Sequence, residues 1–309
     1  MRTVVIGGQG FIGAEIAKTL LRRGDDVTIA DRAADRSRCD ALFGAGSVLA
    51  RSIDILDKAA LRRVMRGADE VYHMAGKLGT SELDDQMITG IEINIAGAVN
   101  VFEACLAAGV PNVFYPSKPN VWLNAYSITK FASEQFARLY SETRDIRICS
   151  LRYFNAYGPN QATGPVRKII PTFALQASRG LPVEIFGDGE QVVDMIFARD
   201  LGRISVDFMR SSYKGPPVDC GRGIPMTVNQ VAADVNRHFE NQGGVKYLPM
   251  RRGETPCTTL VADIAPLRRV LGRLKFSDWR SSLASTLDWY SALDDSVIYS
   301  IPKVLTVAG

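Results

Sequence analysis

Three glycines spaced three residues apart near the N-terminus constrain the fold of this chain most. Gly7, Gly10 and Gly13 follow the apolar run 4–6 and precede residues 11–24, whose apolar spacing is that of an amphipathic helix. This pattern predicts a buried strand that passes through a tight turn into a helix. A side chain at Gly7 would obstruct the turn, and one at Gly13 would separate the helix from the strand.

The predicted helix start suits a phosphate-bearing ligand. A side chain at Gly10 would hold a pyrophosphate away from the helix amides, whereas glycine leaves the N–H groups and the positive dipole end open to it. The next expected strand, residues 27–30, ends at Asp31, where a carboxylate can bond both ribose hydroxyls of an adenosine. Because a carboxylate repels a 2′-phosphate, Asp31 favours NAD over NADP, although the neighbouring Arg32 partly offsets that preference. The turn therefore predicts a dinucleotide-binding fold.

Strand and helix patterns alternate along the next part of the chain. Strands are expected at 47–55, 69–74 and 113–115, and helices at 57–65 and 83–108. The first of these strands should end at Asp54, whose carboxylate would accept from an adenine amino group or else be exposed in a loop. Ala75 and Gly76 leave the backbone bare beside a bound cofactor. Without hairpin signals, the alternation predicts an α/β fold with a parallel sheet covered on both faces.

Length and composition set wider limits. The 309 residues suffice for one large α/β domain and a smaller one, and the net charge of +4, from 37 basic and 33 acidic residues scattered along the chain, indicates no nucleic-acid role. The chain enters its first strand at once and no later apolar run approaches a membrane span, so a cytoplasmic protein without membrane contact is expected. The five cysteines have no metal-ligand spacing and are expected to be buried free thiols, and with two distant histidines no metal site is expected.

Tyr126 and Lys130 are the residues that suggest chemistry. They lie four positions apart in a predicted helix over 126–140, and therefore on one face of it, just after the fifth expected strand. A phenol has an ordinary pKa near 10, and a nearby ammonium lowers it by favouring the phenolate. Such a tyrosine would take a proton from an alcohol while a nicotinamide takes the hydride.

These motifs together resemble the extended short-chain dehydrogenase/reductase superfamily, specifically the NAD-dependent nucleotide-sugar epimerases and dehydratases, over nearly the whole chain. The resemblance rests on GGQGFIG at 7–13, Asp31, Asp54, HMAG at 73–76, the helix carrying Asn94, Gly97, Asn100 and Glu103, YSITK at 126–130, LRYFNAYGP at 151–159, IFGDGEQ at 185–191, RRGE at 251–254, and Trp289-Tyr290. It implies a Rossmann-type doubly wound parallel sheet with a smaller α/β substrate-binding domain. It also implies NAD as cofactor and a nucleotide sugar as substrate.

The resemblance further implies a role for each residue that matches a family motif. Tyr126 and Lys130 would be catalytic, Phe154 would lie near the nicotinamide, and Asn155 would meet the substrate phosphates. The residues expected to contact the cofactor are Gly7, Gly10, Phe11, Ile12, Gly13, Asp31, Arg32, Asp54, Ile55, Ala75, Gly76, Lys77, Asn94, Tyr126, Lys130 and Phe154. Those expected to contact the substrate are Thr80, Ser81, Asn155 and Arg251.

The same resemblance implies interleaved domains and a homodimer. The cofactor domain is expected to comprise 1–155 and about 194–222, and the substrate domain about 156–193 and 223–309. The dimer would pair the helices that contain Asn94 and Tyr126. The tail from Ser296 to Gly309 carries apolar residues that would dock on the body of the protein or on its partner.

The substrate side departs from the family pattern. Lys118 stands where the family carries the serine or threonine that bonds the reacting sugar oxygen, and Ser117 precedes it. Ser117 is the favoured substitute, with Lys118 itself, Thr80 or Ser81 as alternatives. The connection 121–126 is also short, which leaves the pocket open there or closed by another segment.

A further departure concerns the substrate diphosphate. Val193 replaces an arginine that clamps it, and Arg251, which matches the family's other phosphate arginine, remains. Three nearby bases are candidates to compensate, namely Arg167, Lys168 and Arg252.

The expected reaction is epimerisation at C4 of a nucleotide sugar through a 4-keto intermediate. Pro119 and Asn120 stand where dehydratases of the family carry an acid and a base, and neither exchanges a proton at neutral pH. Two alternatives stay open: net oxidation or reduction of an atypical sugar or alcohol, and a non-catalytic dinucleotide sensor.

Overall fold

The structure is a computed structural model, and it describes residues 1–119 and 121–293. Two sequence-based predictions, on Asn120 and on the tail 296–309, lie outside the described residues.

A seven-stranded sheet forms the larger part of the molecule. Its strands, in spatial order, are β11 (Val218–Cys220), β6 (Arg147–Tyr153), β5 (Asn112–Ser117), β4 (Glu70–His73), β1 (Arg2–Ile6), β2 (Asp26–Asp31) and β3 (Leu49–Ser52). Every neighbouring pair is parallel, which confirms the predicted α/β fold. The strand expected to reach Asp54 ends at Ser52, so Asp54 lies in the loop after it.

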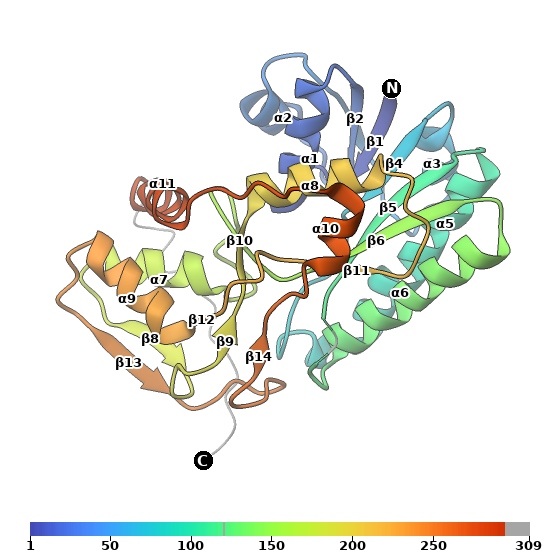
Figure 1. The fold of residues 1–309 in the computed structure, drawn as a ribbon. Coiled ribbons are helices and arrows are strands. Elements are labelled where there is room, and N and C mark those ends of the chain that lie inside the picture. Colours follow the sequence, from blue (N-terminus) through green and yellow to red (C-terminus); the bar gives the residue numbers. More distant parts are fainter. Residues whose placement is uncertain (120, 294–309) are drawn as a thin grey trace.

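Helices cover both faces of this sheet (Figure 1). One face carries α3 (Lys58–Met65), α5 (Gly97–Ala107) and α6 (Ala125–Thr143), and the other carries α1 (Phe11–Arg22), α2 (Arg36–Phe43), α8 (Ala198–Met209) and α10 (Ala265–Leu271). Successive strand side chains point to opposite faces, so Val4 and Ile6 enter the first core while Val5 enters the second. Strands buried on both sides explain the unbroken apolar runs in the sequence.

The helix predicted over 83–108 is divided into four segments. A 3₁₀ turn, η1 (Asp84–Gln86), leads into α4 (Met87–Gly90), a π-helical stretch, η2 (Ile91–Ala96), and α5. Gly109, with φ of 71°, ends the run as predicted. The π-helical stretch changes the direction of the side chains it carries, among them Asn94.

Two predictions from composition are wrong. The run Asp84–Ala107, of 24 residues and mean hydropathy 1.3, is long and apolar enough to cross a membrane by length and composition, although a soluble core helix passes the same test. Its residues Val101 and Phe102 are buried in the core beneath the sheet. Four cysteines are buried thiols as expected, but Cys257 is exposed.

A smaller lobe lies beside the large sheet (Figure 1). It contains the helices α7 (Ile169–Ala177), α9 (Val228–His238) and α11 (Trp279–Ser291), the pair β8 (Val183–Phe186) and β13 (Val245–Leu248), and the strands β9 (Val192–Val193), β12 (Met226–Thr227) and β14 (Thr259–Leu260). The pair β7 (Asn155–Tyr157) and β10 (Met195–Phe197) connects it to the large sheet, to which α8 and β11 return. The exact domain boundaries stay a prediction.

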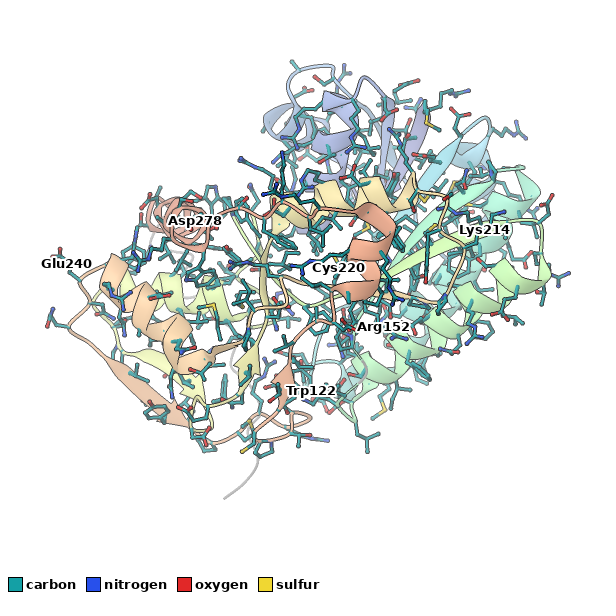
Figure 2. All side chains as sticks on the ribbon, viewed as in Figure 1. Trp122, Arg152, Lys214, Cys220, Glu240 and Asp278 are labelled. Carbon is teal, nitrogen blue, oxygen red and sulfur yellow. The ribbon has the colours of Figure 1, made fainter. Side chains whose placement is uncertain are left out.

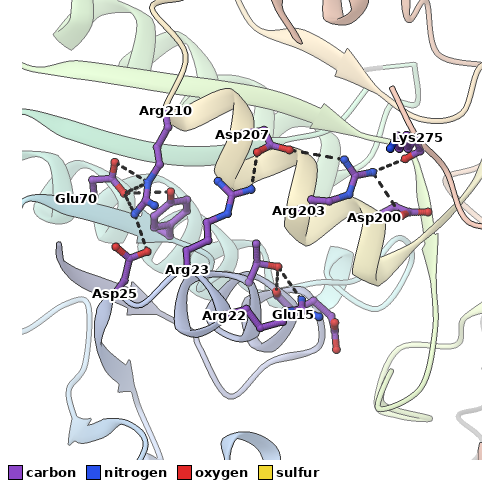
Figure 3. Close-up of polar contacts among 12 residues, drawn as sticks. Glu15, Arg22, Arg23, Asp25, Glu70, Asp200, Arg203, Asp207, Arg210 and Lys275 are labelled. Carbon is purple, nitrogen blue, oxygen red and sulfur yellow. Dashed lines mark hydrogen bonds and ion pairs between the residues drawn. The ribbon is translucent and has the colours of Figure 1, made fainter. Parts of the chain in front are cut away.

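Ion pairs join α8 to the amino ends of the strands in the large sheet (Figure 3). Arg210, just after α8, contacts Asp25 at 2.8 Å and Glu70 at 3.0 Å, and both carboxylates are almost fully buried. One guanidinium thus holds the start of β2, the start of β4 and the end of α8 together.

Candidate active site

The glycine turn has the geometry that the sequence predicts. Gly7 has φ of 75°, and a Cβ there would lie 2.7 Å from the Ala75 nitrogen, while a Cβ on Gly13 would meet the Gly7 carbonyl oxygen. Gly10 is the N-cap of α1 and brings no side-chain hydrogen bond to the first turn, so the amides of Phe11 and Ile12 face no capping group. This bare cradle at a helix start fits a pyrophosphate.

The predicted adenosine-binding carboxylates lie at the ends of β2 and β3. Asp31 accepts a long hydrogen bond from the Gln9 amide, at 3.4 Å, and is half-buried. Asp54 is exposed and accepts from the Leu56 amide at 2.8 Å. Arg32 is also exposed.

Asn94 organises the loop after β4. Its side-chain oxygen accepts from the Lys77 amide at 2.7 Å, and its nitrogen donates to the Lys77 carbonyl at 3.0 Å and to Thr129 Oγ1 at 3.1 Å. Asn94 therefore fixes Lys77 against α6 as a positioning residue. A Cβ on Gly76 would lie 3.2 Å from the Asn94 side-chain oxygen, so a larger residue there would crowd Asn94. Ile55, predicted to contact the cofactor, is buried in the adjacent core.

The pair Tyr126 and Lys130 lies on α6 as predicted, but its electrostatics differ from expectation. Lys130 Nζ donates to Tyr115 Oη at 2.8 Å, on β5, and lies 4.1 Å from the centroid of that ring. Burial, helped by Tyr115, raises the pKa of Tyr126, and burial lowers the pKa of Lys130 to about 7. The prediction that Lys130 lowers the pKa of Tyr126 is therefore wrong for this arrangement, because desolvation outweighs it.

Lys118 lies beside Tyr126, where the family carries a hydroxyl. Its Nζ donates to the Pro119 carbonyl at 2.7 Å and to Ser127 Oγ at 2.8 Å, and lies 5.7 Å from the centroid of the Tyr126 ring. Ser117 ends β5, and its buried Oγ has no hydrogen-bond partner among the described residues. Ser117 and Lys118, two of the four candidates to replace the missing hydroxyl, are thus at the carboxyl end of β5.

The predicted phosphate arginine is already neutralised. Arg251 Nη2 contacts Glu82 at 3.0 Å and its Nη1 contacts Glu254 at 3.4 Å, with only 9% of Arg251 exposed. Glu82 Oε2 also accepts from the Thr80 amide at 2.9 Å, and the buried Ser81 Oγ has no partner among the described residues. The loop 80–82 therefore closes against Arg251 across the two parts of the molecule.

The candidates to replace the missing arginine differ in availability. Arg167 is paired with Glu184 at 2.7 Å, and Arg252 is an exposed group 3.9 Å from Asp84. Lys168 has no ion pair among the described residues, and burial, with Arg251 nearby, lowers its pKa to about 8. Val193 is buried in the core of the smaller lobe.

Phe154 and Asn155 lie where the large sheet passes into the smaller lobe. The Phe154 amide donates to the Cys220 carbonyl at 3.2 Å, and the Asn155 amide donates to the Asp194 carbonyl at 3.1 Å. Both side chains are half-buried at this crossing, and their roles toward the cofactor and the substrate stay predictions.

A segment far along the chain contacts the short connection 121–126. Trp122 Nε1 donates to Thr258 Oγ1 at 3.2 Å, and Asn124 Nδ2 donates to the Gly253 carbonyl at 2.9 Å. Figure 2 shows Trp122 near β14, between the large sheet and the smaller lobe.

Four residues of the site escaped sequence reasoning, namely Glu82, Tyr115, Trp122 and Thr129. Their contacts join positions 15 to 169 residues apart. A tyrosine within β5, next to the predicted catalytic segment, was the one local signal available.

Comparisons with known proteins agree with this geometry. Residues 3–221 match the model of the NAD dependent epimerase/dehydratase family. A UDP-N-acetyl-alpha-D-glucosaminuronate decarboxylase from Bacillus cytotoxicus is 26% identical over 95% of this chain and 99% of its own length. A UDP-glucose 4-epimerase from Azospirillum brasilense is 29% identical over 96% of this chain and 94% of its own.

Solved structures give the same result. A Thermus thermophilus UDP-glucose 4-epimerase, in complex with NAD, superposes with a TM-score of 0.84 and 25% identity, covering 94% of this chain and 99% of its own. The family match spans well over half of the sequence and includes the glycine turn and the Tyr126 helix. The chain therefore belongs to the NAD-dependent epimerase/dehydratase family, and its cofactor is NAD.

Proposed function

We propose that the protein epimerises a nucleotide sugar at C4. One observation carries the proposal: Tyr126 and Lys130 lie one turn apart on α6, at the carboxyl end of β5, while Pro119 occupies the place of a dehydratase acid. Proline has no group that exchanges a proton, so elimination lacks its acid. Relatives named as UDP-glucose 4-epimerases support this reaction and UDP as the nucleotide.

The chain's residues divide the chemistry between them. NAD, held at the glycine turn, would supply the acceptor and donor of the C4 hydride. Tyr126 takes the C4 hydroxyl proton as the 4-keto sugar forms and gives it back when the hydride returns, so no proton or electron is lost. Because burial disfavours the phenolate, an ammonium must stabilise it, and Lys130 lies one turn further along α6.

The diphosphate would need a cation that is free to bind it. Lys168 has no ion pair among the described residues, whereas Arg251 must first leave Glu82. A nucleotide would therefore compete with the Glu82 carboxylate for Arg251.

The reaction is tested on a panel of UDP-, GDP-, CDP- and dTDP-sugars, with C4 configuration followed by NMR and NADH by absorbance. Interconversion of one epimer pair without net NADH is the expected result. Tyr126→Phe should lower kcat by about 10²–10⁴-fold, while Tyr247→Phe, an exposed tyrosine on β13, serves as the control. Stoichiometric NADH would instead establish net oxidation. If no nucleotide sugar is converted and Tyr126→Phe has no functional effect, the protein would instead be a non-catalytic dinucleotide sensor.

We also propose that the protein forms a homodimer through α4, η2 and α6. Large apolar side chains are exposed on these elements, namely Met87, Ile88, Ile91, Ile128, Phe131, Phe136 and Leu139. Several exposed large apolar side chains on neighbouring helical elements are typical of a protein interface.

Phe131→Glu should produce a monomer in light scattering, because it buries a carboxylate in that interface. Leu181→Glu places the same charge on an exposed leucine of the other lobe and should leave the mass unchanged. A wild-type protein of monomer mass would refute the proposal.

A further inference from the structure

Lys118 carries a positive charge that the protein does not neutralise. Its two hydrogen-bond acceptors, the Pro119 carbonyl and Ser127 Oγ, are both neutral. Along 1–119 and 121–293, no carboxylate forms an ion pair with it. Its Nζ lies 5.6 Å from the centroid of Trp122 and 5.7 Å from that of Tyr126, so two aromatic rings offset part of the charge.

The surroundings of this ammonium add to the excess of positive charge. Lys130 is the charged group that acts on it, and both ammoniums are desolvated. Glu134, the carboxylate that favours the charged form of Lys130, is itself paired with Arg152 at 2.7 Å. A partly buried ammonium without a counter-ion is costly, and an anionic ligand relieves that cost.

We propose that Lys118 binds a carboxylate on the sugar of the substrate, beside the carbon whose hydroxyl Tyr126 deprotonates. The inference rests on the proposed C4 epimerisation. In a uronic acid the carboxylate is attached to C5, the ring carbon next to C4, so an ammonium above the Tyr126 ring lies on the side of the site where that group would be. Ser117 Oγ, buried and without a partner among the described residues, is left for the reacting oxygen.

The geometry favours a carboxylate over a neutral hydroxyl as the ligand of Lys118. The ammonium already donates to two neutral oxygens, and a third would leave its charge uncompensated. A carboxylate accepts the remaining N–H and supplies the missing charge at once.

The test compares UDP-glucuronate with UDP-glucose, which differ only at C6. Wild-type kcat/KM should be higher for the uronate by about 10–100-fold, the range for a hydrogen bond between charged groups. In Lys118→Gln this preference ratio should fall at least tenfold, mainly through KM of the uronate. Lys118→Arg should restore part of the preference, and Lys58→Gln, an exposed lysine on α3, should leave the ratio unchanged.

Other outcomes separate this inference from the proposed reaction. Equal kcat/KM for the two sugars in the wild type would overturn the inference and leave epimerisation in place. Equal losses on both sugars in Lys118→Gln would overturn it too, because Lys118 would then serve the reacting oxygen. If neither sugar is converted, the proposed epimerisation of UDP-sugars is refuted. The carboxylate subsite is then tested separately, by measuring the binding of both sugars by calorimetry. Tighter uronate binding that Lys118→Gln abolishes would support the subsite, whereas equal or absent binding would overturn it.

Discussion

Replacing Gly7 with alanine tests the glycine turn on which NAD binding depends. Gly7 has φ of 75°, and an alanine Cβ there would lie 2.7 Å from the Ala75 nitrogen and 2.9 Å from the Met74 carbonyl carbon. These atoms cannot yield freely, because the Met74 amide donates to Ile6 and the Gly7 amide donates to Ala30, each at 2.7 Å. Movement would break the pairing of β4 or β2 with β1.

Gly24 provides a matched control, since its φ is 80° but a Cβ there would meet nothing within 4 Å. Both alanines bear the left-handed backbone cost of about 1–2 kcal/mol. Gly7→Ala adds an overpacking cost of about 1–3 kcal/mol. The difference in the free energy of unfolding between the two variants therefore measures the cost of the close approach between the ends of β1 and β4.

Urea unfolding of the two variants and titration with NAD measure both effects. Gly7→Ala should unfold with about 1–3 kcal/mol less free energy than Gly24→Ala. It should also bind NAD at least tenfold more weakly, equal to about 1.4 kcal/mol, because a displaced turn moves the α1 amides. Equal stability and equal NAD affinity in the two variants would refute the reasoning.

Three further results are expected. Arg210→Met should cost about 3–5 kcal/mol in urea unfolding, because it leaves the buried Glu70 carboxylate without an ion pair and Asp25 with only the N-terminal ammonium. Arg138→Met at an exposed ion pair should have no measurable effect, and similar results for both variants would contradict the role of burial. Glu82→Gln should tighten UDP binding in calorimetry by about 3–10-fold, since it releases Arg251, and weaker binding would be inconsistent with competition. Burial lowers the pKa of Lys118 from 10.5 to about 8. Between pH 8 and 10.5 the unfolded chain therefore binds more protons than the folded protein, and the free energy of unfolding rises with pH. Lys118→Met should make this rise less steep, and an unchanged slope would refute the burial of the Lys118 charge.

The cofactor side could be predicted from the sequence because its requirements are local. Gly7 and Gly13 meet one another's backbone within one turn, and Asp57 caps α3 through amides two and three residues away. Each such requirement is visible in the sequence as a residue type at a fixed spacing. The π-helical stretch around Asn94 shows no such pattern, and the side chain of Asn94 bonds Lys77, 17 residues away.

The substrate side could not be predicted in the same way, because its charges are paired over long distances in sequence. Arg251 matches a family motif, yet its charge is taken by Glu82, 169 residues earlier. Lys130 follows the expected spacing, yet its ammonium is directed to Tyr115 on the strand. A motif gives the residue type at a position and leaves its partner undetermined.

These pairings determine which charged side chains remain without a partner, and those side chains affect which substrate the site binds. Arg251, which the family pattern assigns to phosphate, is held between Glu82 and Glu254, and burial raises the pKa of Glu254. Lys168, next to this cluster, and Lys118, next to Tyr126, by contrast form no ion pair with a carboxylate among the described residues. A substrate gains most from the charges that the protein leaves uncompensated, because binding to Arg251 first requires breaking an existing pair. An anionic group near the reacting carbon should therefore add to the selection that Lys168 exerts on the diphosphate.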